Sequence, residues 1–263
     1  MKIFGLWIPL VTPMYHGNFD QESARRLIES LEPHADGYVV ALSTGEGEGL
    51  SKGEWRAAVE KFATLTKRPV AVGVFLDDIE EIVERSKLAK VSECAAVVIP
   101  VPSDDENVVI DFFSALNAKS ELPIIVYSEK HAIRNVETLR RLDKLTNIVA
   151  IKESSGNDGF IADLQKIKPS LRMAILQGMD HKLPASGGFD GFMVALSNVE
   201  PRLCRRMLEN PTEETQKEIL KKFWEYNLGG DWFVSLKALL YARGILRSAE
   251  QVRQTKLPYE NTF

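Results

Sequence analysis

The sequence predicts an α/β protein of the (β/α)8 TIM-barrel class with additional helices at its C-terminal end. Eight short apolar segments recur at intervals of roughly 20 to 30 residues. They are rich in Val and Ile and mostly unbroken by polar residues, as strands buried on both faces of a parallel sheet are. Segments with helical periodicity separate most of them. The count of eight and the near-even spacing favour a barrel over a doubly wound open sheet.

The expected strands share this apolar character, and all are short. They are residues 7–11, 38–42, 70–74, 95–99, 124–127, 148–152, 173–176 and 192–196. In a barrel or an open parallel sheet, chemistry is found at the carboxyl ends of the strands. The residues that follow each segment are therefore the candidates for function.

The expected helices carry start signals or apolar residues at helical spacing. They are residues 20–31, 55–66, 78–92, 108–118, 136–145, 160–167, 212–226 and 232–242. Asp20 is a capping residue, and Ser51 followed by Glu54 has the form of a capping box. The last two helices follow the eighth strand, and no linker or change in composition interrupts the chain. We expect one domain, 1–263, with the barrel over about 1–210 and C-terminal helices over about 211–263.

Composition and charge exclude several classes of protein. The net charge of −4 argues against a nucleic-acid-binding protein, which would carry a basic face. No apolar run approaches the roughly 18 residues of a membrane span, and Pro9 and Pro13 interrupt what would be a poor signal peptide. We therefore expect a cytoplasmic protein, with Cys94 and Cys204 as buried free thiols. The four histidines are scattered, which argues against a zinc site.

Lys152 is the most unusual residue at a strand end. It directly follows the apolar residues 148–151 and is expected to point into the barrel. Loss of water around its ammonium group lowers the pKa of a lysine toward neutrality. A neutral amine can attack a carbonyl carbon and form an imine. An ion pair with Glu153 or a bound phosphate would explain the same lysine without such chemistry.

Two other strand ends carry polar groups that suit a small acidic ligand. Tyr127 ends the strand before Lys152, so its phenol is a candidate proton donor and acceptor. Ser43-Thr44-Gly45 supplies two hydroxyls and backbone N–H groups that can hold a carboxylate. Alternatively, Tyr127 is a core tyrosine whose hydroxyl is hydrogen-bonded at the rim, and Ser43-Thr44-Gly45 is an ordinary turn whose hydroxyls cap the backbone locally. The glycine-rich run that continues to Gly49 lacks the spacing and the lysine of a nucleotide loop.

Taken together, these residues resemble the dihydrodipicolinate synthase and N-acetylneuraminate lyase superfamily, over nearly the whole chain. The matching segments stand in the same order along the chain: Leu10-Val11-Thr12-Pro13-Met14 with Gly17 and Asp20, Ser43-Thr44-Gly45-Glu46 with Leu50-Ser51 and Glu54, Pro69 with Val72-Gly73, Ile125-Val126-Tyr127, 148–155, Gln177-Gly178-Met179-Asp180, Gly191-Phe192, and Val252-Arg253 with Leu257-Pro258. The resemblance implies a barrel and a homo-oligomer, a dimer or a tetramer.

The resemblance also implies roles for individual residues. Lys152 would form a Schiff base with C2 of pyruvate or a related 2-keto acid, and Tyr127 would relay protons. Ser43 and Thr44 would bind the carboxylate of the keto acid. Gly178 and Val194 would line the pocket through their backbone. No metal or organic cofactor is implied, because the covalent lysine imine performs the activation.

The chain departs from the family pattern at two loops. The synthases carry two tyrosines after the fourth strand, the second shared across a dimer interface, where this chain has Pro100-Val101-Pro102-Ser103. The arginine that holds a dicarboxylic substrate falls near Ala132, and Arg134 could replace it only if the loop shifts. From loop position alone, Glu129, Lys130 and His131 are candidates for recognising the distal half of the substrate.

These features predict a lyase, a class I aldolase that cleaves or forms a C–C bond with pyruvate as one partner. Condensation of the dihydrodipicolinate synthase type and dehydration of a keto-deoxy sugar acid use the same imine and stay open as alternatives. A barrel that binds a keto acid without turning it over is the alternative of another class. No nucleic acid or membrane is expected as a partner.

Overall fold

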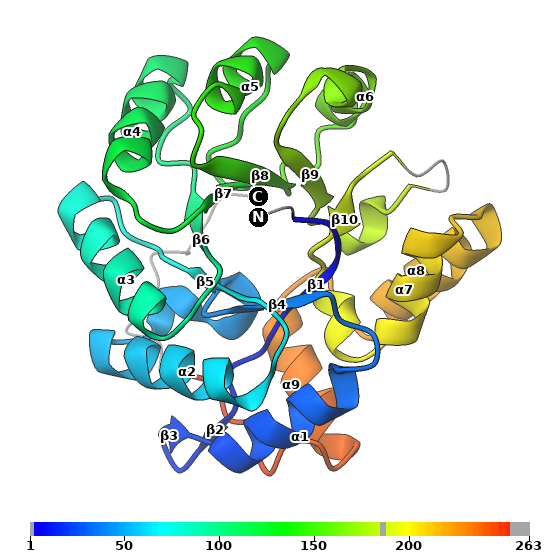
Figure 1. Cartoon of the computed structure of the whole chain (residues 1–263). Coiled ribbons are helices and arrows are strands. Elements are labelled where there is room, and N and C mark those ends of the chain that lie inside the picture. Colours follow the sequence, from blue (N-terminus) through cyan, green and yellow to red (C-terminus); the bar gives the residue numbers. More distant parts are fainter. Residues whose placement is uncertain (1–2, 185–187, 253–263) are drawn as a thin grey trace.

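The structure is a computed structural model that describes residues 3–184 and 188–252. Eight parallel strands close into a barrel in the order β1-β10-β9-β8-β7-β6-β5-β4, ringed by helices (Figure 1). The barrel strands are β1 (Gly5–Pro9), β4 (Gly37–Val40), β5 (Val70–Gly73), β6 (Ala96–Pro100), β7 (Ile124–Ser128), β8 (Ile148–Glu153), β9 (Ala174–Gln177) and β10 (Gly191–Phe192). The predicted fold class is confirmed.

Each expected helix is present, with ends that differ by only a few residues. The helices are α1 (Gln21–Leu31), α2 (Lys52–Leu65), α3 (Ile79–Val91), α4 (Glu106–Lys119), α5 (Val136–Asp143), α6 (Asp158–Ile167), α7 (Pro201–Glu209), α8 (Glu213–Glu225) and α9 (Trp232–Ala242). The capping box of Ser51 and Glu54 is formed at the start of α2. Helix α7 was not predicted, although Pro201 at its first position is a known start signal.

The eighth strand is shorter than the sequence predicts. The segment 192–196 contributes only Phe192 to β10, and the chain then turns into the 3₁₀ helix η5 (Ala195–Asn198). Side chains hold this turn in place of a strand ladder. The Asn198 amide donates to the carbonyl oxygen of Pro9 at 2.8 Å, and the Leu196 N–H donates to Asp180 Oδ1 at 2.7 Å. A short hairpin of β2 (Met14–Tyr15) and β3 (Asn18–Phe19), also not predicted, follows β1.

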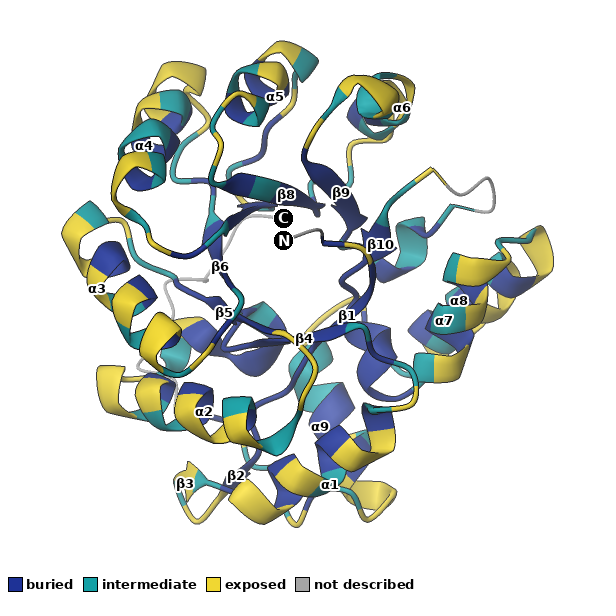
Figure 2. Ribbon diagram, viewed as in Figure 1, coloured by how far each residue is buried: buried dark blue, intermediate teal, exposed yellow. Residues whose placement is uncertain are grey.

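Side chains alternate between two apolar layers along the strands. One set fills the barrel interior, with small residues such as Ala71, Ala96 and Ala150 among larger ones such as Ile125. The other set packs between the strands and the helices. Figure 2 shows the buried strands and the exposed outer faces of the helices. Tyr127 and Ala150 belong to the inner set, so the alternation also places Lys152, two residues after Ala150 and paired with Tyr127, toward the barrel axis.

The C-terminal helices lie at the end of the barrel where the strands end. Helix α8 contacts η4 (Asp180–Lys182), and α9 contacts both η1 (Ser43–Gly45) and η5. Val252 is described, whereas Arg253, Leu257 and Pro258 of the expected closing element lie outside the described residues. Within the described ranges no helix is long and apolar enough to cross a membrane. Cys94 and Cys204 are free and buried, as predicted.

Candidate active site

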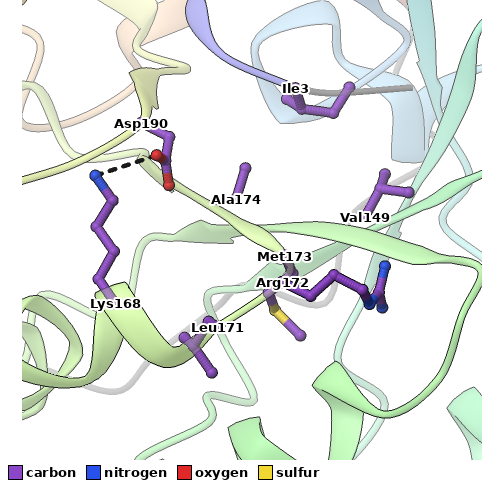
Figure 3. Close-up of a pocket in the computed structure, with 8 residues that line it drawn as sticks. All are labelled: Ile3, Val149, Lys168, Leu171, Arg172, Met173, Ala174 and Asp190. Atoms are coloured by element: carbon purple, nitrogen blue, oxygen red, sulfur yellow. Dashed lines mark ion pairs between the residues drawn. The ribbon is translucent and has the colours of Figure 1, made fainter.

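One cavity lies at the amino-terminal ends of the strands, and its charged groups are already paired. Its volume is about 310 Å³. Figure 3 shows the residues that line it. Lys168 Nζ lies 3.1 Å from Asp190 Oδ1. Arg172 donates to backbone carbonyl oxygens, including those of Leu145 and Ile148 at 2.8 Å. This cavity therefore offers no unpartnered reactive group, and it lies at the end of a barrel that serves stability.

The second cavity lies at the carboxyl ends of the strands and has a volume of about 290 Å³. It brings together six of the predicted site residues: Lys152, Tyr127, Ser43, Thr44, Glu129 and Gly178. The rest of the lining comes from the loops after β8, β9 and β10 and from the C-terminal helices: Ser154, Met179, Asp180, His181, Met193, Ala195, Phe223, Leu228, Gly229 and Trp232. The cavity thus collects the candidate chemistry from distant parts of the chain.

Lys152 is a buried amine inside this cavity. It lies opposite Tyr127 in the pairing of β7 with β8 and is 5% exposed. Burial lowers the pKa of Lys152 to about 8, although the carboxylates of Glu129 and Asp180 act in the opposite direction. Glu153 does not pair with it, because that carboxylate accepts from the N–H and the hydroxyl of Ser155 on the other side of the strand. About a tenth of the lysine is therefore the neutral amine at pH 7, far more than of an ordinary lysine.

Tyr127 lies against the amine and keeps its proton. Lys152 Nζ is 4.0 Å from the centroid of the Tyr127 ring. The phenol oxygen lies 2.9 Å from Ser43 Oγ, and the Phe75 ring packs edge-on against Tyr127. Burial, followed by the charge and hydrogen bonding of Glu129, raises the pKa of Tyr127 well above its ordinary value. The site therefore holds a protonated phenol beside a lysine of lowered basicity.

The turn at η1 and the glycine after β9 shape the cavity around the lysine. Thr44 Oγ1 accepts a hydrogen bond of 3.2 Å from the indole of Trp232. A Cβ on Gly178 would lie 2.0 Å from Ser154 Oγ and 2.7 Å from Lys152 Cε, so only glycine leaves room for the lysine. Gly45 does not line the cavity; its carbonyl oxygen accepts from Thr12 Oγ1 at 2.6 Å.

Two other predicted residues lie away from the cavity. His131 Nδ1 is 3.1 Å from Asp104 Oδ2, and His131 is not among the residues that line the cavity. Arg134 also turns toward Asp104, at 3.8 Å, and does not reach the site. The Val194 side chain packs in the layer between barrel and helices, because its neighbours Met193 and Ala195 face the cavity.

Asp180 is a lining residue that the sequence analysis did not assign to the site. Its buried carboxylate accepts from the N–H of Leu196 at 2.7 Å, and burial raises the pKa of Asp180 to about 6. Its position three residues after the end of β9 was the available signal. Phe223 and Trp232, the aromatic wall, come from α8 and α9, and no local pattern indicates where those helices dock.

A buried ion pair connects the substrate turn to the C-terminal helices. Lys237 of α9 pairs with Glu46, and both side chains are at most 1% exposed. Glu46 also accepts from the N–H of Val252 at 2.8 Å, and Lys237 donates to the Glu250 carbonyl oxygen at 2.8 Å. Since Glu46 directly follows η1, this pair fixes the end of the turn that carries Ser43 and Thr44.

Replacing Lys237 with methionine should reduce the free energy of unfolding by about 3–5 kcal/mol, because the buried Glu46 charge loses its partner. The double variant Glu46→Gln/Lys237→Met should recover part of that loss, since burial opposes the charged form of both partners. Urea unfolding followed by circular dichroism measures both changes. A single-variant loss below about 1 kcal/mol would show that the pair is not buried in solution.

Comparison with known proteins gives matches along the whole chain. The family described as the dihydrodipicolinate synthetase family matches residues 2–261. The 4-hydroxy-tetrahydrodipicolinate synthase 2 of Clostridium acetobutylicum is 28% identical over 189 residues, 68% of this chain and 66% of that protein. The 4-hydroxy-tetrahydrodipicolinate synthase of Neisseria gonorrhoeae is 31% identical over 187 residues, 67% of this chain and 64% of that protein. The chain thus matches just under two thirds of the length of these relatives.

A solved structure extends the similarity over nearly the complete fold. The 4-hydroxy-tetrahydrodipicolinate synthase from Methylacidiphilum fumariolicum SolV has a TM-score of 0.86 and 26% identity. The match covers 98% of this chain and 91% of that chain. The barrel and the C-terminal helices described above therefore have a counterpart in that protein.

Proposed function

Because the chain belongs to the dihydrodipicolinate synthetase family, we propose that it is a class I aldolase-type lyase that acts on a 2-keto acid through an imine on Lys152. One observation carries the proposal. A buried lysine with a pKa lowered to about 8 lies 4.0 Å from a phenol ring in a cavity at the carboxyl ends of the barrel strands. An amine in this state is nucleophilic toward a carbonyl carbon.

Each lining residue has a part in this mechanism. The carboxylate of the keto acid binds at the η1 turn, where Ser43 and Thr44 line the cavity. Lys152 attacks C2, Tyr127 supplies the proton with which the C2 oxygen leaves as water, and the phenol then regains a proton from solvent. The protonated imine then withdraws electrons from the C3–C4 bond. Cleavage leaves an enamine of pyruvate and releases an aldehyde; the reverse direction joins them.

The imine takes the place of a cofactor in this proposal. It is the electron acceptor for C–C cleavage, so the steps above use only side chains of the cavity and the substrate. Condensation of the dihydrodipicolinate synthase type and dehydration of a keto-deoxy sugar acid begin with the same imine. The assembly of the chain into a homo-oligomer, a dimer or a tetramer, stays a prediction.

The rate of imine formation should rise with pH and level off above about pH 8. Only the neutral amine of Lys152 attacks the carbonyl, and its pKa is lowered to about 8. Below that value the neutral fraction falls about tenfold for each pH unit. The rate is measured by mixing the protein with pyruvate at a series of pH values from 6 to 9.5 and reducing the imine with borohydride after increasing times. A rate that does not change with pH would separate Lys152 from the nucleophilic step.

Turnover of a panel of 2-keto acids tests the proposed function. Longer 4-hydroxy-2-keto acids are supplied one at a time, and released pyruvate is measured with lactate dehydrogenase and NADH. The reverse reaction is tested with pyruvate and a series of aldehydes. Release or consumption of pyruvate supports a lyase. Ligand-dependent thermal stabilisation with no product across the panel would instead identify a keto-acid-binding protein.

A further inference from the structure

We propose that the Glu129 carboxylate is the terminal proton acceptor of the site, taking the proton that Tyr127 releases when the phenol oxygen receives one from the substrate. This rests on the proposed function and gives Glu129 a role other than recognition of the distal half of the substrate. Glu129 acts through Tyr127, so it is a positioning and relay residue. The arrangement of both side chains around one cavity carries the inference.

The backbone of β7 places the two side chains on the same side. Tyr127 lies in β7 and Glu129 directly follows Ser128, the last residue of that strand, and both side chains line the same cavity. Ser128 between them faces the other way, where its hydroxyl accepts from the N–H of Ile133 at 3.1 Å. Glu129 lines the same cavity as Tyr127 and Lys152 and is half-buried, whereas Tyr127 is 1% exposed. The Glu129 side chain is therefore more accessible to water than the buried phenol of Tyr127.

The phenol needs an acceptor to act as a base. A phenol whose pKa is raised keeps its proton at neutral pH, so it can take a proton from substrate only while giving up its own. Its described polar partners are the Ser43 hydroxyl and the Glu129 carboxylate, and a hydroxyl is not a base. Lys152 is consumed in the imine. Asp180 accepts from the N–H of Leu196 and is not among the described partners of Tyr127.

The proposed proton transfer balances in both halves of the cleavage reaction. The C4 hydroxyl gives its proton to the Tyr127 oxygen as the phenol proton moves to Glu129. The C4–O bond becomes a carbonyl, and the C3–C4 electron pair passes into the imine to form the enamine. The aldehyde leaves. The proton then returns from Glu129 through Tyr127 to C3, and water hydrolyses the imine to pyruvate and Lys152.

Glu48 is a second carboxylate close enough to Glu129 for the two charges to interact. Glu48, in η2 (Gly47–Gly49), interacts with the Glu129 carboxylate, and burial and this like charge raise the pKa of Glu48. The Lys130 ammonium acts on Glu48 in the opposite direction. Lys152 and Tyr127 also interact electrostatically with Glu129.

Chemical rescue tests this role. Glu129→Ala should lower kcat by roughly 10²-fold or more with KM changed by less than about threefold, and formate should restore part of kcat in a saturable manner. Glu129→Gln should lower kcat as much as Glu129→Ala does, and formate should not restore it, because the amide fills the space and cannot accept a proton. Glu137→Ala, which removes an exposed glutamate of α5, is the matched control and should keep wild-type kinetics.

Three outcomes would overturn the assignment. The first is a kcat of Glu129→Gln within about threefold of the wild-type value. The second is an effect of either Glu129 substitution on KM alone. The third is a Glu129→Ala variant whose kcat formate does not restore. Borohydride trapping of pyruvate on each variant separates this proposal from the proposed function. If the wild-type protein forms no imine, the proposed function fails. If the variants trap pyruvate but keep full kcat, only the role of Glu129 fails.

Discussion

Replacing Lys152 with methionine is expected to abolish turnover and to make the protein more stable than the wild type. The variant lacks the amine that attacks the substrate, so no imine forms. Methionine has a similar length and no charge, and it fits the apolar surroundings of Tyr127 and Met193. Loss of activity with a gain in stability distinguishes a functional lysine from a structural one, whose removal would destabilise the fold.

The sign of the stability change follows from the pKa of Lys152. Its pKa is about 8 in the folded protein, below its ordinary value of 10.5. The unfolded chain therefore binds more protons between these values, and wild-type stability rises as pH increases through that window. Below pH 8 the burial of the charged Lys152 ammonium lowers the free energy of unfolding by its full amount, on the order of 3 kcal/mol. The free energy of unfolding of Lys152→Met should exceed that of the wild type by the largest amount at pH 7 and by less at pH 9.5.

Urea unfolding at the two pH values, together with the pyruvate-release assay, measures both effects. Lys166→Met is the matched control because Lys166 is an exposed lysine of α6. It should keep full activity and change the free energy of unfolding by less than about 0.5 kcal/mol. Measurable turnover by Lys152→Met would exclude the imine mechanism.

Tyr127→Phe is expected to lower kcat by roughly 10²–10⁴-fold, the usual range for one acid–base group. Phenylalanine keeps the ring packed against Phe75 and beside Lys152 and removes only the hydroxyl that contacts Ser43. Imine formation should slow, because the C2 oxygen lacks its proton donor, yet trapping at long times should still modify Lys152.

Steady-state kinetics and a time course of trapping measure these two effects. Tyr241→Phe is the control, because Tyr241 of α9 is 55% exposed, and it should not change kcat. A Tyr127→Phe variant with kcat within about threefold of the wild type would remove the phenol from the mechanism.

The fold and the centre of the site could be predicted because the signals are local. Apolar strand segments and helix start signals lie in short windows of sequence, and parallel strands place their carboxyl ends together. That rule alone puts Lys152 and Tyr127 on adjacent strands, and the structure pairs them directly.

The remaining site residues depend on contacts between distant segments. Phe223 and Trp232 reach the cavity only because α8 and α9 dock across the barrel end. The shortening of β10 depends on hydrogen bonds that Asn198 and Asp180 make to other loops. The position of His131 outside the cavity lining also depends on such a contact. Its pairing with Asp104 joins two loops whose geometry no periodicity specifies.

Borohydride trapping with pyruvate, followed by peptide mass mapping, tests the central claim most directly. The account predicts one modified site, with the mass of a reduced pyruvate adduct on the peptide that contains Lys152, and no adduct in Lys152→Met. An adduct spread over exposed lysines, or none at Lys152 under conditions in which the protein turns over a 2-keto acid, would contradict it.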